Sequence, residues 1–460
     1  AIALYEGALP EVAGYIAKAV KARMEAGISQ QELAKRIGTQ KPNISRIEKG
    51  QQNISLDTLI KIASALDKEV SFSLSEKHAD EVSRYSLRLY DEELITFSME
   101  DAGLSGIKTT ILSCNNDLLF LLPLDLTLSD DGMLSWLRRR TIPKNRAFVD
   151  EILKTLGLSI NNTKGIIDVC KGLSLNDSYW IVPEGFEGKF SSYNLYENRF
   201  SNILSLVAYT GVGHSKPLDS TSPELTTHGM LRKAWRHIEG KGIYLFKGGS
   251  EGAANAGKEP YSEFYASQIA QQMGLHSISY DLENWKGILA STCKLFTDID
   301  TAYIPIGWIV KTGGIQACLD YYAQISSEAA EELKSMLVFD AVIYNEDRHF
   351  GNFGILRDSH SGKVIGAAPV FDNGLSLFNY AMQEDIDHLD EYAKTRANPY
   401  GISYETVCQG VMGKKQRSQL QRLINFRFTR HPSINMPEER LIPIEQHIQK
   451  RVRQLLSLPR

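Results

Sequence analysis

A short polar segment in the second half of this chain constrains its fold more than any other feature. Residues 345–352 read NEDRHFGN, which places Asp347 five residues before Asn352. An apolar, strand-like run then leads to a second acid, Asp372. Amide and carboxylate oxygens of this kind are the hard ligands that Mg²⁺ prefers. A fold that uses all three must bring a loop and the end of a following strand together around one cation.

This order of groups is typical of kinases, in which an Asp orients the attacking hydroxyl while Asn and Asp oxygens hold magnesium. We predict that Asp347 is the catalytic carboxylate and that Asn352 and Asp372 are metal ligands. Lys247 ends an apolar strand, where its amine can reach nucleotide phosphates, and Glu263 on the next helix is placed to hold that amine in an ion pair. Each of these features has a simpler explanation when it is taken alone: a surface Lys, a polar loop or a hairpin turn. Their complete order along the chain favours a kinase.

The first 75 residues predict a separate, all-helical domain. Apolar residues recur at helical spacing in 11–26, and Gly27, Gly38 and Gly50 end successive helices. Ser29 is a good N-cap for the second helix. The segment between Gly27 and Gly50 therefore has the two short helices and tight turn of a helix-turn-helix.

Polar side chains at the N-terminus of the second helix, and at the exposed start and face of the third, suit phosphates and base edges. The predicted DNA-binding residues are Gln30, Gln40, Lys41, Asn43 and Arg46. A helical protein-interaction domain is the alternative. We favour DNA because the turn, the helix caps and the polar face coincide.

Composition is that of a globular protein able to bury a large core, with 43% hydrophobic and 23% charged residues among 460. The net charge of -4 argues against a basic nucleic-acid coat protein. The sequence holds no apolar run of bilayer length and no export signal at its start. Its five cysteines are scattered, as in reduced cytosolic proteins. We expect a cytoplasmic bacterial protein that does not contact membranes.

Two regions resemble known families. Residues 12–72 resemble the Xre/lambda-repressor family, including antitoxins of the HipB type. Residues 225–380 resemble the HipA family of bacterial serine/threonine kinases. The second resemblance rests on NEDRH with Asn352, on APVFD at 368–372 and on EFY at 263–265. Residues 85–160 resemble the small N-terminal subdomain of that family more faintly, mainly in RTIPKNR at 140–146.

The resemblance implies a multidomain chain: an all-α helix-turn-helix domain followed by an α+β, two-lobed kinase fold whose C-terminal lobe is mostly helical. The expected divisions are 1–75 for the DNA-binding domain, 76–84 for a linker, 85–180 for the N-terminal subdomain, 181–315 for the small lobe and 316–460 for the helical large lobe.

The resemblance also implies the cofactors ATP and Mg²⁺. The phosphate loop falls at 226–233 and contains Gly229, and the adenine contact is expected near Lys294 and Phe296. HipA-like kinases autophosphorylate a serine in that loop, where this chain has Thr226 and Thr227. A phosphate there would repel the nucleotide, so phosphorylation of either threonine is expected to inhibit the kinase.

The implied partners are operator DNA, a protein substrate such as a translation component, and a second copy of the chain, since helix-turn-helix modules usually bind DNA as dimers. The implied role is a toxin–antitoxin module that regulates its own transcription. Two alternatives stay open at this point. One is a repressor whose kinase fold is an inactive sensor, and the other is a small-molecule phosphotransferase.

Overall fold

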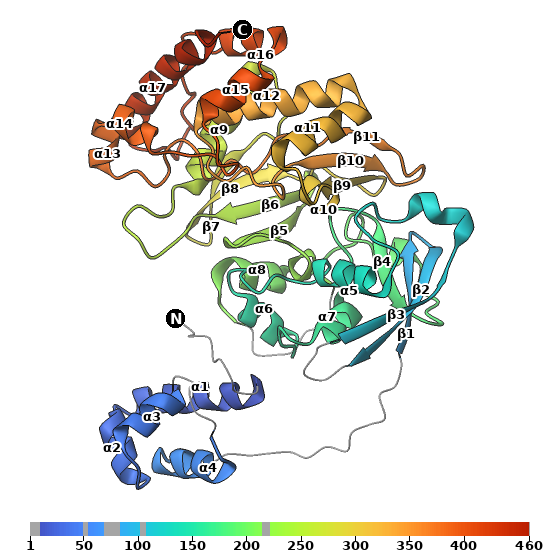
Figure 1. Cartoon of the computed structure of the whole chain (residues 1–460), viewed down its shortest axis with the longest axis vertical. Helices are drawn as coiled ribbons and strands as arrows, with labels where there is room; N and C mark the ends of the chain where they lie inside the picture. Colours follow the sequence, from blue (N-terminus) through green and yellow to red (C-terminus); the bar gives the residue numbers. More distant parts are fainter. Residues whose placement is uncertain (1–9, 49–53, 69–82, 102–106, 214–220, 460) are drawn as a thin grey trace. The chain divides into compact units, whose positions relative to one another are not determined.

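A computed structural model describes residues 10–48, 54–68, 83–101, 107–213 and 221–459 (Figure 1). The chain divides into two compact units, Ala1–Glu81 and Val82–Arg460. The described part of the first unit is entirely helical, whereas the second combines antiparallel sheets with helices. The predicted fold class, an all-α domain followed by an α+β unit with a helical C-terminal part, is confirmed.

The first unit packs short helices around an apolar core. Its described helices are α1 (Pro10–Glu25), α2 (Gln30–Arg36), α3 (Lys41–Glu48) and α4 (Leu56–Ala65). Ile16, Leu33 and Ile44 are buried in this core. The Ser29 hydroxyl accepts a hydrogen bond from the backbone N–H of Glu32 at 3.1 Å, which caps α2 as predicted.

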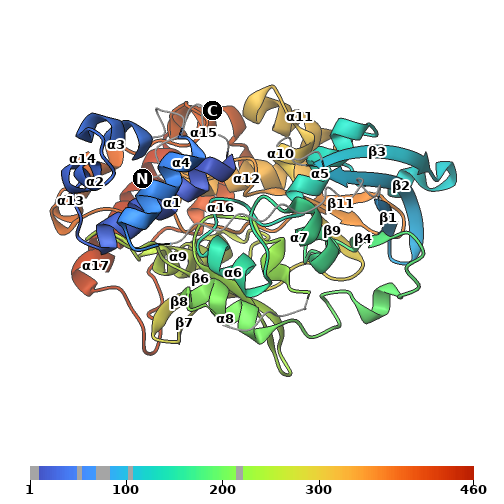
Figure 2. The ribbon, with the colours of Figure 1, turned by 90° about the horizontal axis from the view of Figure 1, so that it is seen from below.

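The second unit begins with an antiparallel sheet in the order β3-β2-β1-β4. Its strands are β1 (Ser83–Leu89), β2 (Glu92–Asp101), β3 (Ile107–Cys114) and β4 (Tyr179–Pro183). Between β3 and β4 lie η2 (Asn116–Leu121), α5 (Asp130–Arg139), α6 (Val149–Thr155) and α7 (Thr163–Cys170). Figures 1 and 2 show α5 beside β3, where the Asp130 carboxylate accepts from the N–H of Ile111 at 2.8 Å.

The next sheet runs in the order β5-β6-β8-β7 and is also antiparallel. Its strands are β5 (Lys233–Ile238), β6 (Gly242–Gly248), β7 (Asp281–Trp285) and β8 (Ile288–Lys294). It is preceded by η3 (Phe190–Ser192), α8 (Asn202–Thr210) and η4 (Pro223–Leu225). Helix α9 (Glu259–Met273) follows β6 and packs against β7 and β8. It ends at Gly274, whose φ of 75° suits glycine.

The last part of the chain is a helical layer with a small sheet, ordered β11-β10-β9. The strands are β9 (Thr301–Pro305), β10 (Gly354–Asp358) and β11 (Val364–Ala367). The helices are α10 (Ile306–Ile309), α11 (Gly314–Ile325), α12 (Ser327–Ile343), α13 (Gln383–Asp387), α14 (Leu389–Lys394), α15 (Tyr404–Val411), α16 (Lys414–Gln421) and α17 (Glu438–Leu456). Almost all of α12 beyond its first turn is buried or half-buried in the main core. It ends at Tyr344 in the left-handed region, which turns the chain directly into residues 345–352.

Two segments differ from the structure that their sequence suggests. The apolar residues 118–122 are typical of a buried strand, but 118–121 lie in the 3-10 helix η2, with Leu119 45% and Phe120 55% exposed. A short apolar run does not distinguish a strand from a helical turn. The apolar residues 302–310 are also typical of a strand, but β9 ends at Pro305 and α10 begins at Ile306.

The domain divisions also shift. Most of the predicted linker 76–84 lies outside the described residues, and β1 already begins at Ser83. The first sheet extends to Pro183 in β4, slightly past the division expected at 180. The division at 315 separates β9 from its partner β10, although the two strands pair.

Candidate active site

Lys247 lies at the centre of the candidate site. It ends the central strand β6, opposite Lys233 of β5 and Ser291 of β8, and is 8% exposed. Its Nζ donates to Oε1 of Glu263 on α9 at 2.9 Å and also contacts Oδ1 of Asp372. The predicted ion pair between Lys247 and Glu263 is therefore present, and it brings β6, α9 and the segment after β11 to one point.

Charge in this cluster is tightly balanced. Burial alone would lower the pKa of Lys247, but Asp372 and Glu263 outweigh burial and raise it above its usual value. Burial would raise the pKa of Asp372, yet Lys247 and then Lys233 lower it to about 2. Glu263 has no exposed surface, and burial raises its pKa. The Glu263 carboxylate also accepts from the backbone N–H of Asn373 at 2.7 Å, which ties α9 to the Asp372 segment.

The loop 345–352 is held by a buried arginine. The Arg348 guanidinium has no exposed surface and donates to both carboxylate oxygens of Asp340 on α12, at 3.0 and 3.1 Å. It also donates to the backbone carbonyl of Asn352 at 3.1 Å and to that of Phe371. A planar guanidinium can satisfy several acceptors at once. Arg348 thus fixes the loop to the residue that precedes Asp372.

Asp347 is positioned by its neighbours in the same loop. Its backbone N–H donates to Oδ1 of Asn345 at 3.0 Å, and its carbonyl accepts from Nδ2 of Asn352 at 2.8 Å. The side chain is half-buried. Burial raises the pKa of Asp347. The nearby His349 acts to lower this pKa, whereas the negative charge of Asp372 raises it further. A carboxylate in this environment is suited to accept a proton from a bound hydroxyl.

The donor set fits magnesium. Asn352 uses its amide nitrogen to hold the Asp347 carbonyl, so its Oδ1 is the remaining ligand atom. Asp372 contacts Lys247 through Oδ1, so its Oδ2 is the carboxylate oxygen that remains to bind a metal ion. Within the described ranges no group of three or more His, Cys, Asp or Glu side chains is arranged for a metal. Two hard oxygens are nevertheless the usual protein contribution to Mg²⁺, whose other ligands are water and phosphate.

Lys233 connects the predicted phosphate loop to this cluster, and its role was not predicted from the sequence. The Nζ of Lys233 donates to the carbonyl of His228 at 2.9 Å, and a side chain at Gly229, where φ is 94°, would collide with it. Lys233 is buried. Burial first and the neighbouring Lys247 second lower its pKa to about 7. The signal was present, since Lys233 stands inside the predicted loop 226–233, but the register that pairs it with Lys247 is not readable from the sequence.

The two threonines proposed for autophosphorylation point inward. Thr226 is 4% exposed and its Oγ1 donates to the carbonyl of Leu173 at 2.8 Å. Thr227 Oγ1 donates to the carbonyl of Pro223 at 2.6 Å. The segment is anchored by Arg146, which forms a buried ion pair with Glu224 and donates to the Thr227 carbonyl at 2.8 Å. Either hydroxyl must leave these contacts before it can accept a phosphate.

The residues predicted near adenine differ in position. Phe296 packs its ring on Phe371, next to Asp372, with a centroid distance of 5.4 Å. Lys294 is exposed at the end of β8 and pairs with Tyr244 rather than with Lys247. Side chains alternate along a strand, so Lys294 projects from the face opposite Ser291 and Lys247. The structure therefore brings Phe296, but not the Lys294 amine, to the cluster.

In the first unit, four of the predicted DNA-facing residues lie along α3, from Gln40 just before it to Arg46 in its last turn. Gln40, Lys41 and Arg46 are exposed, and Asn43 is half-buried. Asn43 Oδ1 accepts from the Arg46 guanidinium at 2.6 Å, which orients both side chains on one surface.

Gln30 has a different environment. Its Nε2 donates to Oε2 of Glu48 at 2.7 Å. Arg23 also pairs with Glu48, at 2.6 Å. Gln30 thus belongs to a network that ties α1, α2 and α3 together. A contact between its side chain and phosphate would require it to leave Glu48.

A family model for helix-turn-helix domains matches residues 21–72. An uncharacterized HTH-type transcriptional regulator of Haemophilus influenzae is 43% identical over 56 residues, which is 12% of this chain and 57% of that protein. The helix-turn-helix domain is thus supported by sequence as well as by fold.

The second unit has a kinase-like fold and a kinase among its relatives. The serine/threonine-protein kinase CtkA of Helicobacter pylori is 30% identical over 149 residues, covering 28% of this chain and 46% of that kinase. The chain spans about half the length of both curated relatives. These matches agree with the HipA-type resemblance predicted from the sequence.

Two solved structures are similar to the chain. The crystal structure of the Helicobacter pylori proinflammatory kinase CtkA has a TM-score of 0.38 at 18% identity, covering 50% of this chain and 89% of that one. The second is a chain in the structure of the Shewanella oneidensis toxin–antitoxin system HipA, HipB and its operator DNA. Its TM-score is 0.48 at 12% identity, and the match covers 82% of this chain and 100% of that one. In the described part of this chain no helix is both long and apolar enough to cross a bilayer.

Proposed function

We propose that this chain is an ATP- and Mg²⁺-dependent serine/threonine protein kinase of HipA type, joined to a DNA-binding helix-turn-helix domain. The observation that carries the proposal is the meeting of Lys247, Glu263 and Asp372 from three separate segments, beside a braced loop that holds Asp347 and Asn352. This is the arrangement expected for phosphoryl transfer, which depends on positioning and charge neutralisation.

Each side chain has a distinct part in this proposal. Asp347 orients the acceptor hydroxyl and takes its proton. Lys247 and Lys233 hold phosphate oxygens, and Glu263 positions Lys247. Arg348 positions the loop that carries Asp347. Asn352 and Asp372 would hold Mg²⁺, which would supply charge neutralisation at the phosphates of a bound ATP.

The test is transfer of labelled γ-phosphate to protein by the full chain. We expect Asp347→Asn to reduce the rate at least about a hundredfold, because a positioned proton acceptor contributes that much or more. Asp387→Asn, at an exposed carboxylate on α13, should leave the rate unchanged. Equal, negligible transfer by all three proteins would favour an inactive sensor. Transfer to sugars or aminoglycosides in place of protein would favour a small-molecule phosphotransferase.

We further propose that Thr226 or Thr227 is a self-inhibitory phosphorylation site. A dianion on either residue is incompatible with the buried contacts that their hydroxyls make now, so the loop would be released. Mass spectrometry after incubation with Mg-ATP should find phosphate in the peptide containing both, and Thr226→Ala or Thr227→Ala should prolong activity. Phosphate confined to other peptides would contradict this assignment.

For the helix-turn-helix domain we propose binding to the operator of its own gene, with α3 facing the DNA. Lys41→Ala and Arg46→Ala should each weaken binding of the upstream promoter fragment in a fluorescence anisotropy titration, and loss of Lys41 should lower the salt dependence. Lys61→Ala, on the exposed face of α4 with Asp57 as its partner, is the matched control. Undiminished affinity in both α3 variants would exclude this face.

A toxin–antitoxin role, a protein substrate such as a translation component and a homodimeric state complete the proposal. All three rest on the sequence resemblance. Phosphoproteomic comparison of cells expressing the wild type and Asp347→Asn identifies the substrate. Light scattering of the full chain with and without promoter DNA measures whether two copies assemble on it.

A further inference from the structure

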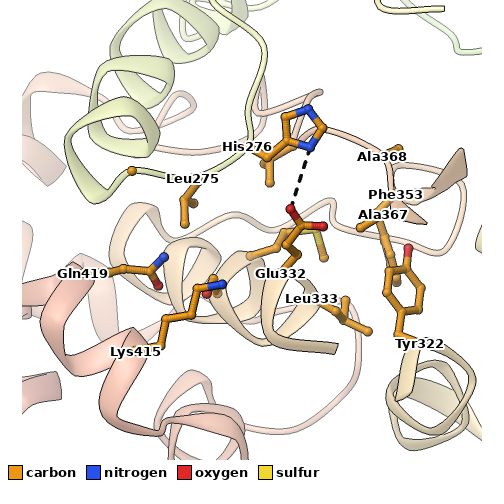
Figure 3. Close-up of a pocket in the computed structure, with 14 residues that line it drawn as sticks. Leu275, His276, Tyr322, Glu332, Leu333, Phe353, Ala367, Ala368, Lys415 and Gln419 are labelled. Carbon is orange, nitrogen blue, oxygen red and sulfur yellow. Dashed lines mark ion pairs between the residues drawn. The ribbon is translucent and has the colours of Figure 1, made fainter. Parts of the chain in front are cut away.

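The segment that connects α9 to β7 runs alongside the segment that leads to Asp372. The backbone N–H of Ile278 donates to the Val370 carbonyl at 2.9 Å, and the N–H of Val370 donates to the His276 carbonyl at 2.8 Å. In Figure 3, His276 and Ala368, one from each segment, line the same pocket. These contacts hold the connection beside a residue only two positions before Asp372, so a side chain slightly further along the connection can reach it.

Tyr280 is the side chain that makes this contact. Its hydroxyl accepts a hydrogen bond from the backbone N–H of Asp372 at 3.1 Å. The other end of the same peptide group, the Phe371 carbonyl, accepts from the Arg348 guanidinium. One peptide is therefore held at both ends, with its N–H bound by Tyr280 and its carbonyl bound by Arg348. The proposed function uses Arg348 to position the loop 345–352 but assigns no part to Tyr280.

The conformation of Asp372 depends on the groups that hold the backbone around it. Its φ is 54°, in the left-handed region, which is unfavourable for most L residues. Such a conformation persists where the surrounding structure determines it. The N–H of the peptide that follows Asp372 donates to the Glu263 carboxylate at 2.7 Å. Because the peptides on both sides are held, the side chain leaves the backbone in one direction, toward Lys247.

The Tyr280 hydroxyl suits this position because it accepts a hydrogen bond without carrying a charge. The side chain is half-buried, and burial raises its pKa well above the ordinary value. The hydroxyl therefore keeps its proton at neutral pH. A carboxylate in its place would repel the negative charges of Asp372 and Glu263, which already share the ammonium of Lys247.

We propose that Tyr280 is a positioning residue for Asp372 and thereby for the metal. The inference rests on the proposed function, in which Asp372 is a ligand of Mg²⁺. By holding the peptide before Asp372, Tyr280 keeps the carboxylate in the orientation in which Oδ1 contacts Lys247 and Oδ2 remains for the cation. Without the hydroxyl, the Asp372 N–H loses the acceptor that it has here, and the carboxylate is less well directed. The expected loss falls on metal binding.

Hydrogen exchange in the full chain without ligands tests the contact itself. Tyr280→Phe keeps the ring and removes the acceptor, so the Asp372 amide should exchange about threefold to tenfold faster. Tyr85→Phe is the matched control. Tyr85 is also buried, and its hydroxyl donates to Asp168 at 2.7 Å in a different sheet of the unit, so its loss should leave exchange at Asp372 unchanged. The same exchange at Asp372 in both variants would overturn the proposal.

Nucleotide binding with and without metal tests the consequence. Calorimetric titration with adenylyl imidodiphosphate, an ATP analogue that resists hydrolysis, in Mg²⁺ and in EDTA gives the factor by which the metal raises the affinity. Tyr280→Phe should reduce this factor about threefold to tenfold and leave the affinity in EDTA unchanged, whereas Tyr85→Phe should change neither. An unreduced factor in Tyr280→Phe, or a wild type whose affinity does not depend on Mg²⁺, would also overturn the proposal.

Phosphate transfer separates this role from a general loss of structure. In Tyr280→Phe the Mg²⁺ concentration for half-maximal transfer should rise, and saturating Mg²⁺ should restore most of the wild-type rate. A rate that saturating Mg²⁺ does not restore would give Tyr280 a purely structural role and overturn the proposal. A wild type that shows the expected exchange and Mg²⁺ dependence but transfers no phosphate would contradict the kinase activity and leave the role of Tyr280 standing.

Discussion

Lys233 is a lysine held in an environment that disfavours its charge. Its amine is buried beside Lys247, and its pKa falls to about 7 from an ordinary value of 10.5. Phosphate oxygens near the amine would favour the charged form and raise that pKa again. Such a residue gains charge when an anion binds, and that change is measurable.

We therefore expect proton uptake when Mg-ATP binds near pH 8, where Lys233 is largely neutral without an anion and protonated with one. Titration calorimetry in buffers of different ionisation enthalpy measures the proton count. Uptake should fall in Lys233→Met and persist in Lys241→Met, an exposed lysine in the β5–β6 turn. The same shift affects stability. The unfolded chain binds the proton more tightly, so stability should rise with pH between about 7 and 10.5. Equal uptake in both variants would contradict this role for Lys233.

Glu263 is a buried acid that pairs with the cation Lys247 and also accepts a hydrogen bond from the Asn373 backbone. Lys247→Met would leave its fully buried carboxylate without the amine that it now contacts at 2.9 Å. Breaking a buried pair in this way typically costs about 3–5 kcal/mol. We expect urea denaturation to show a loss of that order for Lys247→Met. The double variant Lys247→Met with Glu263→Leu should recover much of it. A further loss in the double variant would show that Glu263 has other essential partners.

At the scale of elements, the loop 345–352 is rigid because one side chain ties it to α12 and to the Asp372 segment. Arg348→Lys keeps the charge but cannot serve Asp340, the Asn352 carbonyl and the Phe371 carbonyl together. We expect faster hydrogen exchange across this loop and a fall in phosphate transfer of about a hundredfold. Arg396→Lys is the control, since Arg396 pairs with Glu346 of the same loop at a partly exposed position, where such pairs contribute about 0–1 kcal/mol.

Sequence patterns predicted most elements but not all of their limits. The large lobe was expected to be helical, and 316–343 is, although the extended backbone of Ser326 divides this stretch into α11 and α12. The run 118–122 was misassigned because its exposed members, Leu119 and Phe120, are as apolar as its buried ones. The ion pair between Lys247 and Glu263 could be predicted because both residues flank one strand–helix connection. The place of Lys233 could not, since it depends on how β5 pairs with β6.

At the scale of the whole molecule, the described parts of the two units bury separate cores. The helix-turn-helix unit buries Ile16, Leu33 and Ile44, whereas the kinase-like unit has its own large core around α12. Domains with independent cores usually fold alone. We expect residues 83–460 expressed without the first unit to keep a cooperative melting transition, within a few degrees of that in the full chain, and to bind Mg-ATP with unchanged affinity. A non-cooperative melt of residues 83–460 would show that the first unit is needed for stability.

The contact between Lys247 and Asp372 has a consequence for the order in which ligands are accepted. The Lys247 amine contacts Oδ1 of Asp372, so a lone metal ion bound at Oδ2 would lie near an ammonium, and a lone triphosphate bound at the amine would lie near a carboxylate. When both ligands bind, the charge of each offsets that of the other. Magnesium and nucleotide should therefore help one another onto the protein, and by thermodynamic reciprocity each should raise the affinity for the other by the same factor.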